Sequence, residues 1–268
     1  MSGGVLEIER LAKSFGTKPV LTDVSFQVAK GEIVGLVGPS GSGKSTLLSQ
    51  LTGAQRPDAG SIRYDGVPIA DRARPFAFMP QRDVLLPWRR ILDNAAIGLE
   101  VAGHSRRDAR AKASELLAPF GLEGTEELYP RQLSGGMRQR VSFLRTVVQR
   151  RPVLLLDEPF GALDAITRDE LQRWLLDIWA ENRWSILLIT HDIREAIRMS
   201  DRVLVLSAPG TITGEVEVTR DIPRGDSFVR DLRVPELQDR LHQLLHAAAR
   251  NAAPASGTVR KTVDLGLA

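Results

Sequence analysis

The chain has 268 residues, of which 43% are hydrophobic, 26% charged and 5% aromatic, a balance that excludes a chain disordered throughout. The 36 Lys and Arg against 33 Asp and Glu leave a formal charge of +3. That surplus is small and mostly spread among acidic residues, unlike the concentrated basic stripe of a nucleic-acid-binding protein. Cysteine is absent, which excludes disulfides, cysteine-ligated metal centres and thiol nucleophiles.

No segment of the sequence has the pattern of a transmembrane span or of a secretory signal. Residues 1–9 lack the basic segment and apolar core of a secretory signal. The tightest apolar runs, Val153–Leu156 and Ile186–Ile189, have the length of strands, well short of the roughly 20 residues that span a bilayer. We therefore expect a cytosolic protein without a transmembrane segment of its own.

The first 80 residues are expected to form strands around one helix. Alternation of apolar and polar residues predicts strands at 5–9 and 24–28. The continuous apolar run Ile33–Val37 is typical of a central strand buried on both faces. A glycine-rich loop follows, a helix is expected from Lys44, and residues 76–79 are expected to form a further strand.

In residues 82–133 the spacing of apolar residues changes from that of strands to that of helices. Apolar residues recur there at helical spacing, at positions Ile91, Leu92, Ala95, Ala96, Leu99, Ala113, Leu116, Leu117 and Phe120. The pattern predicts a helical insertion in an otherwise α/β chain.

Beyond the insertion, strands and helices alternate. A helix is expected from Gly135, and buried strands are expected at 153–156, 185–190 and 202–207. Strands that alternate with helices predict a mainly parallel sheet.

The C-terminal part is expected to hold one or two helices at 219–246, which complete a folded domain of residues 1–246. The predicted buried stripe of these helices consists of Leu232, Leu237, Leu241, Leu244 and Leu245. The Ala-rich segment 247–268 is expected to be a poorly ordered tail.

A phosphate-binding loop is predicted between the strand at 33–37 and the helix from Lys44, the context that the pattern G-x-x-x-x-G-K-[ST] requires. The matching residues are Gly38, Pro39, Ser40, Gly41, Ser42, Gly43, Lys44, Ser45 and Thr46. Glycines let the backbone curl so that its N–H groups point at phosphate oxygens, and the helix N-terminus adds positive potential. Lys44 is expected to contact the β- and γ-phosphates, and the Ser45 hydroxyl to ligate Mg²⁺.

Two carboxylates end the apolar strand 153–156. Beside a phosphate loop, such a strand places Asp157 near the Mg²⁺ shell. Glu158, one residue further, is suited to orient and deprotonate the water that attacks the γ-phosphorus.

A second anion site is predicted at Ser134, Gly135 and Gly136. Ser134 is a good helix N-cap, and the two glycines leave backbone N–H groups exposed at a helix N-terminus. One nucleotide cannot reach two distant sites on one chain, but a head-to-tail dimer would hold ATP between the phosphate loop of one copy and Ser134–Gly136 of the other. A capped helix with a glycine-rich entry is the alternative for this segment taken alone.

With these motifs in this order over residues 5–215, the sequence resembles the nucleotide-binding subunit of an ABC transporter. The resemblance implies a P-loop NTPase fold of the ABC type, with an α/β core, an N-terminal antiparallel β subdomain and a helical insertion. It also implies that Phe15 stacks on adenine and that His191 contacts the γ-phosphate. Gln81 would touch Mg²⁺ or the attacking water and sense the membrane partner.

The resemblance completes the set of expected site residues. Gly161–Asp164 match the D-loop, which makes Asp164 a residue of the nucleotide site. Met137 and Gly161 depart from the Gln and Ser that are commoner in the family. The expected catalytic residues are Lys44, Gln81, Glu158 and His191, and the expected Mg²⁺ ligands are Ser45, Gln81 and Asp157.

The function that the resemblance implies is ATP hydrolysis that powers transport, with ATP and Mg²⁺ bound. The expected partners are a second copy, integral permease subunits and an extracytoplasmic substrate-binding protein, with no nucleic acid, at the cytoplasmic face of the inner membrane. The runs Leu85–Trp88 and Ile91–Asn94 resemble the importer subgroup for nitrate, sulfonates and taurine. An exporter or lipid-transport ATPase is one alternative, and a non-transport ABC ATPase that acts on nucleic acid or ribosomes is another.

The start of the helical insertion is a candidate interface. Leu85, Leu86 and Trp88 are flanked by arginines, an arrangement that suits docking on a permease, and internal packing is the alternative. The nearest approach to a basic cluster is predicted to be a solvated helix face in preference to a partner or lipid contact; it consists of Arg89, Arg90, Arg106, Arg107 and Arg110.

Overall fold

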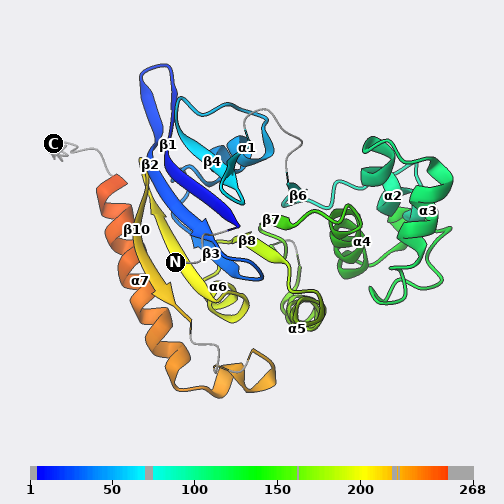
Figure 1. The fold of residues 1–268 in the computed structure, drawn as a ribbon. Coiled ribbons are helices and arrows are strands. Elements are labelled where there is room, and N and C mark those ends of the chain that lie inside the picture. The colour runs from blue at the N-terminus through cyan, green and yellow to red at the C-terminus, as the bar shows by residue number, and fades with distance from the viewer. Residues whose placement is uncertain (1–4, 70–74, 162, 219–221, 223, 253–268) are drawn as a thin grey trace, which may run out of the picture.

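Strands from both halves of the chain form one mixed sheet (Figure 1). The computed structural model describes residues 5–69, 75–161, 163–218, 222 and 224–252. Within them, the sheet order is β5-β4-β1-β2-β10-β9-β3-β8-β7-β6. The strands are β1 (Leu6–Phe15), β2 (Lys18–Val28), β3 (Ile33–Val37), β4 (Ala59–Tyr64), β5 (Val67–Pro68), β6 (Phe76–Met79), β7 (Val153–Asp157), β8 (Ser185–Ile189), β9 (Arg202–Ser207) and β10 (Gly210–Glu217).

The two halves of the sheet differ in strand direction. β6, β7, β8, β3 and β9 run parallel, whereas β5, β4, β1 and β2 pair antiparallel. Every residue of β3 and β8 is buried, as expected for central parallel strands covered on both faces. β10 pairs with β9 on one side and with β2 on the other, which joins the halves. The predicted parallel core with an antiparallel N-terminal portion is confirmed.

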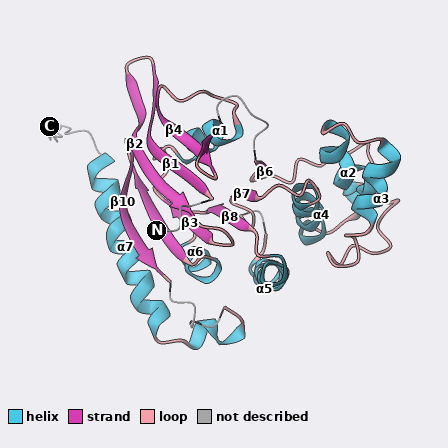
Figure 2. Cartoon of the chain, viewed as in Figure 1, coloured by secondary structure: helices cyan, strands magenta, loops and turns pink. Residues whose placement is uncertain are grey.

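The helices fall into three groups, each of which shares a hydrophobic core with part of the sheet (Figure 2). The helices are α1 (Lys44–Thr52), α2 (Ile91–Val101), α3 (Arg106–Ser114), α4 (Gly135–Val147), α5 (Ala165–Asn182), α6 (Ile193–Met199) and α7 (Arg233–Ala252), with 3₁₀ turns at Pro130–Gln132 and Asp226–Arg230. α1 shares a core with β1, β2 and β3, α2 to α5 share one with β6 to β8, and α6 and α7 pack on β9 and β10. Among the described helices, none has both the length and the apolar character that crossing a bilayer requires.

The predicted helical insertion stands beside the sheet, at the end of the molecule beyond β6 and β7 (Figure 1). Residues 82–133 are all described and contain α2 and α3 but no strand. The apolar residues that predicted these helices supply their buried face, with Ala95, Ala96 and Ala113 fully buried. α2 packs on both α3 and α4, so the insertion is joined to the core through α4.

The basic cluster of the insertion is largely ion-paired. Arg106 and Arg110 both pair with Asp93, at 3.2 Å and 2.5 Å, and the Asp93 side chain is only 6% exposed. Two further pairs are Arg89–Glu100 and Arg90–Glu127. Four of the five arginines therefore form ion pairs within the insertion, while the Arg106 side chain stays 70% exposed.

Helix α7 extends further than predicted and begins later. It continues to Ala252, so residues 247–252, which were predicted to belong to a poorly ordered tail, are helical, and residues 253–268 lie outside the described residues. The leucine stripe is buried as predicted at Leu241, with Leu237, Leu244 and Leu245 packed beside it. Leu232 is 91% exposed, because it precedes the first helical residue and does not share the helical period.

Candidate functional site

The phosphate loop joins β3 to α1 in a shape that only glycine permits at two positions. Gly43, at the N-cap of α1, has φ of 101°, and a Cβ there would lie 2.6 Å from the Leu21 side chain. A Cβ on Gly38 would lie 2.3 Å from the Leu206 carbonyl oxygen. Because the N-cap residue has no side chain, the first N–H groups of α1 are left for an anion.

The Lys44 ammonium lies within this loop. It donates to the carbonyl oxygens of Gly38 at 2.7 Å and Pro39 at 3.0 Å. Burial lowers the pKa of Lys44, and the carboxylates of Glu158 and Asp157 oppose that shift. The cation therefore lies between the loop and the two carboxylates, where a phosphate group would contact it.

β7 ends at the two predicted carboxylates. Burial raises the pKa of Asp157, the charge of Glu158 raises it further, and Lys44 opposes both. Glu158 has a left-handed backbone, with φ of 46°, and its N–H donates to the Ile189 carbonyl at 2.7 Å. A non-glycine residue in this region is uncommon, and such strain concentrates at functional sites.

Gln81 and His191 converge on Glu158. Gln81 donates its Nε2 to Glu158 Oε2 at 2.7 Å, and His191 Nδ1 lies 3.2 Å from the same oxygen. Gln81 follows β6 and His191 follows β8, the two strands that flank β7. Because the carboxyl ends of parallel strands meet at one edge of a sheet, the fold brings together three residues that are far apart in the sequence.

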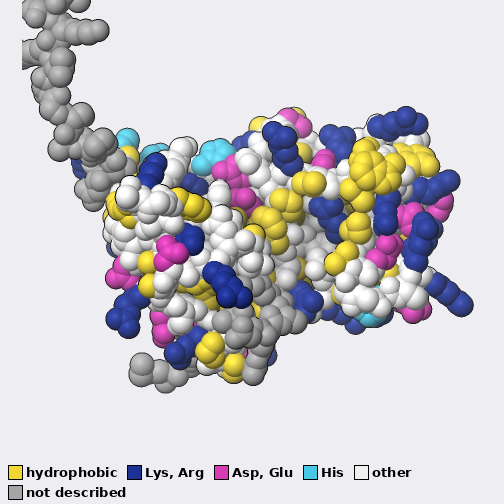
Figure 3. Space-filling model, turned by 90° about the horizontal axis from the view of Figure 1, so that it is seen from above, with side chains coloured by type: hydrophobic (Ala, Val, Ile, Leu, Met, Phe, Trp, Pro, Cys, Tyr) yellow, Lys and Arg dark blue, Asp and Glu magenta, His cyan; other side chains and the backbone are white. Residues whose placement is uncertain are grey.

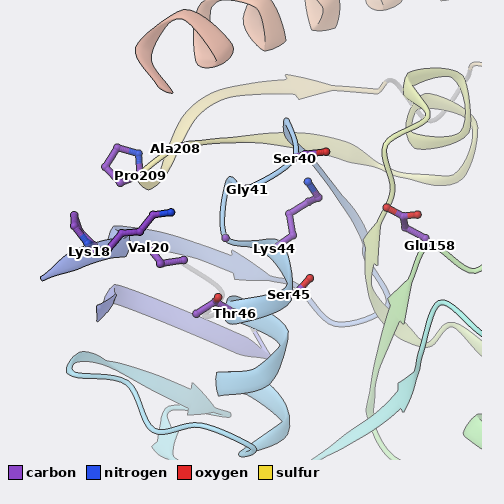
Figure 4. Close-up of a pocket in the computed structure, with 12 residues that line it drawn as sticks. Lys18, Val20, Ser40, Gly41, Lys44, Ser45, Thr46, Glu158, Ala208 and Pro209 are labelled. Atoms are coloured by element: carbon purple, nitrogen blue, oxygen red, sulfur yellow. The ribbon is translucent and has the colours of Figure 1, made fainter. Parts of the chain in front are cut away.

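A cavity of about 710 Å³ extends from the β1–β2 hairpin past the phosphate loop to Glu158 (Figure 4), within the size range of small-molecule sites. The predicted residues that line it are Ser40, Gly41, Gly43, Lys44, Ser45, Thr46 and Glu158. The residues that sequence analysis missed are Lys18, Pro19, Val20, Ala208 and Pro209. No motif marks these five; they reach the cavity because Leu21 of β2 pairs with Gly210 of β10.

Phe15, the expected adenine-stacking residue, lies beside the cavity and not in its lining. It ends β1, is 48% exposed, and pairs across the hairpin with Lys18, which does line the cavity. The Lys13 ammonium lies 5.9 Å from its ring centroid. The structure thus leaves the ring accessible near one end of the cavity.

The second predicted anion site is separate from this cavity. Ser134 caps α4 by accepting the Met137 N–H at 3.2 Å, and both Ser134 and Gly135 are exposed. Asp164 caps α5 by accepting the N–H groups of Ile166 and Thr167, each at 3.1 Å. Hydrogen bonds from Thr167 lower the pKa of Asp164.

The donor set at the phosphate loop fits Mg²⁺. A hydroxyl from Ser45, a carboxylate from Asp157 and an amide oxygen from Gln81 are oxygen donors of the kind that this ion prefers. A cation would offset the burial and the Glu158 charge that raise the pKa of Asp157. Among the described residues, no cluster of three or more His, Cys, Asp or Glu is placed to hold a metal ion.

Comparison with known proteins places the chain among ATP-binding subunits. Residues 21–161 match the ABC transporter family. The taurine import ATP-binding protein TauB of Yersinia pestis is 44% identical over 209 residues, which cover 78% of this chain and 82% of TauB. The formylaminopyrimidine import ATP-binding protein ThiZ of Halalkalibacterium halodurans is 40% identical over 222 residues, 82% of this chain and 87% of ThiZ. A dimeric ATP-binding cassette in a post-hydrolysis state, bound to ADP and phosphate, has a TM-score of 0.69 at 28% identity, over 80% of this chain and 99% of the cassette.

Proposed function

The chain belongs to the ABC transporter family as an ATP-binding, ATP-hydrolysing subunit, and from that premise we propose that it powers the import of a small anion such as taurine, another sulfonate or nitrate. In this proposal two copies dock on integral permease subunits at the cytoplasmic face of the inner membrane, and an extracytoplasmic binding protein delivers the substrate. The names of the relatives TauB and ThiZ support import as the direction of transport.

The arrangement around Glu158 carries the proposed chemistry. Its carboxylate lines the same cavity as Lys44 (Figure 4), and Gln81 and His191 both contact its Oε2. A carboxylate fixed in this way orients a water and takes its proton as the water oxygen attacks the γ-phosphorus. The bond from the γ-phosphorus to the bridging oxygen breaks, ADP keeps the electron pair, and Lys44 with the α1 N-terminus stabilises the charge that develops.

Ser45, Asp157 and Gln81 are the residues that would hold Mg²⁺. When bound, the ion neutralises charge on the β- and γ-phosphate oxygens. We expect phosphate release by the purified chain to require Mg²⁺ and to stop on chelation by EDTA. Equal rates with and without EDTA would remove the ion from the proposal.

Dimerisation follows from the separation of the two anion sites. Ser134 and Gly135 are exposed and lie outside the cavity of their own chain, so they are available to the nucleotide of a second copy. The dimeric form of the related cassette supports this arrangement. We expect Glu158→Gln, which retains ATP, to sediment as a dimer with ATP and as a monomer without it. Ser134→Glu in that background places a negative charge against the phosphates and should prevent the dimer.

The proposed permease surface lies on the helical insertion. Trp88 is 71% exposed and Val84 is 56% exposed, whereas Leu85 is buried and packs internally. Seen from above, hydrophobic side chains gather at the end of the molecule that holds α2 and α3, with Lys and Arg around them (Figure 3). Exposed aromatic anchors with a charged rim are typical of protein interfaces.

Two experiments test the transport proposal. The first is affinity purification from detergent-solubilised membranes, where we expect a multi-helix permease with the wild type and its loss with Trp88→Ala. Leu232→Ala, which changes an exposed apolar residue outside the insertion, is the matched control. Recovery of only ribosomal or DNA-associated proteins would contradict a role in transport.

The second experiment measures uptake of labelled taurine by cells that lack the chain. We expect uptake to return with the wild type and not with Glu158→Gln. Nitrate and other sulfonates compete in the same assay and rank the substrates. No uptake of any of these anions with the wild type would overturn the substrate class and leave the ATPase chemistry standing.

A further inference from the structure

The segment that follows Gln81 is bonded to the helix that carries the second anion site. Arg145 of α4 donates Nη2 to the Asp83 carbonyl oxygen at 2.6 Å and Nη1 to the Val84 carbonyl oxygen at 2.9 Å. One guanidinium thus holds two consecutive carbonyl groups. A planar fork with donors in fixed geometry is suited to such paired acceptors.

A second arginine on α4 reinforces this contact. Arg138, two turns before Arg145, donates Nε to the Asp83 carboxylate at 3.1 Å. It also donates Nη1 to the carbonyl oxygen of Leu133 at 2.8 Å, directly before Ser134. Asp83 is therefore held at its backbone by one arginine and at its side chain by the other.

Val84 has a strained backbone at this contact. Its φ is 43°, and among the described non-glycine residues with positive φ it is the one with a β-branched side chain. Such a residue is an outlier in the left-handed region. The side chain is 56% exposed, so its packing does not account for the conformation, whereas the bond from Arg145 to its carbonyl group does.

The Arg145 guanidinium is partly removed from water, which disfavours its positive charge. Burial lowers the pKa of Arg145, and the Asp83 carboxylate opposes that shift. Its guanidinium also donates Nη2 to the Ser142 hydroxyl at 3.2 Å. A charge that is removed from water is tolerated when its hydrogen bonds are satisfied. The carbonyl groups of Asp83 and Val84 provide these hydrogen bonds for Arg145.

We propose that Arg145 is a positioning residue for ATP hydrolysis, which holds Asp83 and Val84 in a strained conformation and thereby keeps Gln81 on Glu158. Gln81 lies two residues before Asp83, and its side chain donates to Glu158 Oε2 at 2.7 Å. If the carbonyl groups were released, Val84 would relax to a negative φ and the chain before it would turn away. The inference rests on the proposed role of Gln81 in hydrolysis.

The test compares kcat and KM for ATP in Arg145→Lys, Val84→Gly and the double variant. Lysine keeps the charge but replaces the rigid planar fork with a single rotatable ammonium, which does not fix the two carbonyl groups in one geometry, so kcat should fall about tenfold while KM stays within about twofold, since a small misplacement acts on the reacting geometry. Glycine adopts positive φ without strain, so Val84→Gly alone should match the wild type. The double variant should recover most of the lost kcat, because the conformation no longer needs the arginine.

Val84→Pro is an independent test that leaves the half-buried guanidinium of Arg145 in place. Proline fixes φ near −65° and excludes the observed conformation at an exposed position, so kcat should fall as in Arg145→Lys. Arg140→Lys is the matched control, since Arg140 lies on α4 but contacts Trp174 and the Phe120 carbonyl; its kcat should not change.

Each outcome bears on the proposal. Normal kcat in Arg145→Lys or Val84→Pro, or no rescue of Arg145→Lys by Val84→Gly, overturns it. Gln81→Ala in the same assay distinguishes the role of Gln81 in hydrolysis from the role of Arg145 in positioning it. If Gln81→Ala leaves kcat intact, the role of Gln81 fails and this inference with it; if only Gln81→Ala lowers kcat, the inference about Arg145 fails alone.

Discussion

Gln81 donates its side-chain amide to Glu158 Oε2 at 2.7 Å, so the side chain that follows β6 fixes the carboxylate that follows β7. The same oxygen lies 3.2 Å from His191 Nδ1. The carboxylate is thus oriented from both neighbouring strands of the sheet. Such orientation is what a general base requires, because its lone pair must point at one particular water.

The first prediction concerns Glu158→Gln. The amide keeps the size of the side chain but cannot take a proton, so ATP binding should stay within a few-fold and kcat should fall about 100- to 10,000-fold, the usual contribution of a general base. Phosphate release and nucleotide titration measure the two effects. Glu181→Gln, at an exposed position of α5, should change neither, and unchanged turnover in Glu158→Gln would remove Glu158 from the role of base.

The second prediction concerns Lys44→Ala, which should act on binding. The ammonium lies within the phosphate loop, 2.7 Å from the Gly38 carbonyl oxygen. Loss of one charge-assisted hydrogen bond, worth about 1.5–3 kcal/mol, should raise the Kd for ATP about 10- to 100-fold. Calorimetric titration with ATP measures it, with the exposed Lys30→Ala as control. An unaltered Kd in Lys44→Ala would contradict a phosphate contact.

The order of helices and strands could be predicted because the pattern of apolar and polar residues within each segment indicates which of its faces is buried. Ile33–Val37 was predicted as a central strand, and all five residues are buried in β3. The Gly-rich loop and Asp157–Glu158 were recognisable because phosphate and Mg²⁺ chemistry demands particular residue types at fixed spacing. These are properties of short segments, which a sequence displays directly.

Long-range pairing could not be predicted in the same way. Lys18 and Pro209 line the cavity only because β2 and β10 are neighbours in the sheet, and neither residue carries a motif. The strain at Val84 and its bonds to Arg145 join segments 61 residues apart. Such contacts depend on the assembled fold, and the residue types involved are common on any surface.

The third prediction is a pH-dependent stability set by Glu195 of α6. The residue is 4% exposed, and its pKa is raised to about 7, mainly by burial and also by the charge of Asp192, against the opposing effects of Thr190, Arg168 and Gln172. In the unfolded chain the pKa is near its ordinary value of 4.5. The folded state therefore holds a proton that the unfolded state has lost, and stability falls as pH rises from the unfolded to the folded pKa.

The cost should approach about 3 kcal/mol above neutral pH, since one pKa unit corresponds to about 1.4 kcal/mol. Glu195→Gln cannot ionise and should remove it. Urea unfolding at about pH 5 and about pH 8.5 measures the effect, and the variant should be more stable than the wild type at the higher pH only. The exposed Glu236→Gln is the control, and an equal gain at both values would show that ionisation of Glu195 is not the cause.

The last prediction concerns Asn94, which braces the loop that presents Trp88. Asn94 is fully buried in α2; its Oδ1 accepts the Leu86 N–H at 2.7 Å, and its Nδ2 donates to the carbonyl oxygens of Leu86, Arg89 and Arg90 at 3.1, 3.0 and 3.1 Å. One amide thus satisfies both ends of the loop. Asn94 therefore lies beneath the surface that Trp88 exposes.

Asn94→Ala leaves these backbone groups without their side-chain partner and should destabilise the chain by about 2–3 kcal/mol, the usual cost of an unsatisfied buried group. Asn94→Asp keeps an acceptor for the Leu86 N–H but turns a carboxylate toward three carbonyl oxygens, so it should cost at least as much. Urea unfolding measures stability, and trypsin reports the loop itself, because Arg89 and Arg90 become cleavable when it opens. Asn182→Ala removes an exposed bond to the Ile178 carbonyl and should shift stability by no more than about 0.5 kcal/mol. Wild-type stability and cleavage rates in Asn94→Ala would mean that the loop is held by other contacts, and that Trp88 is not presented by this amide.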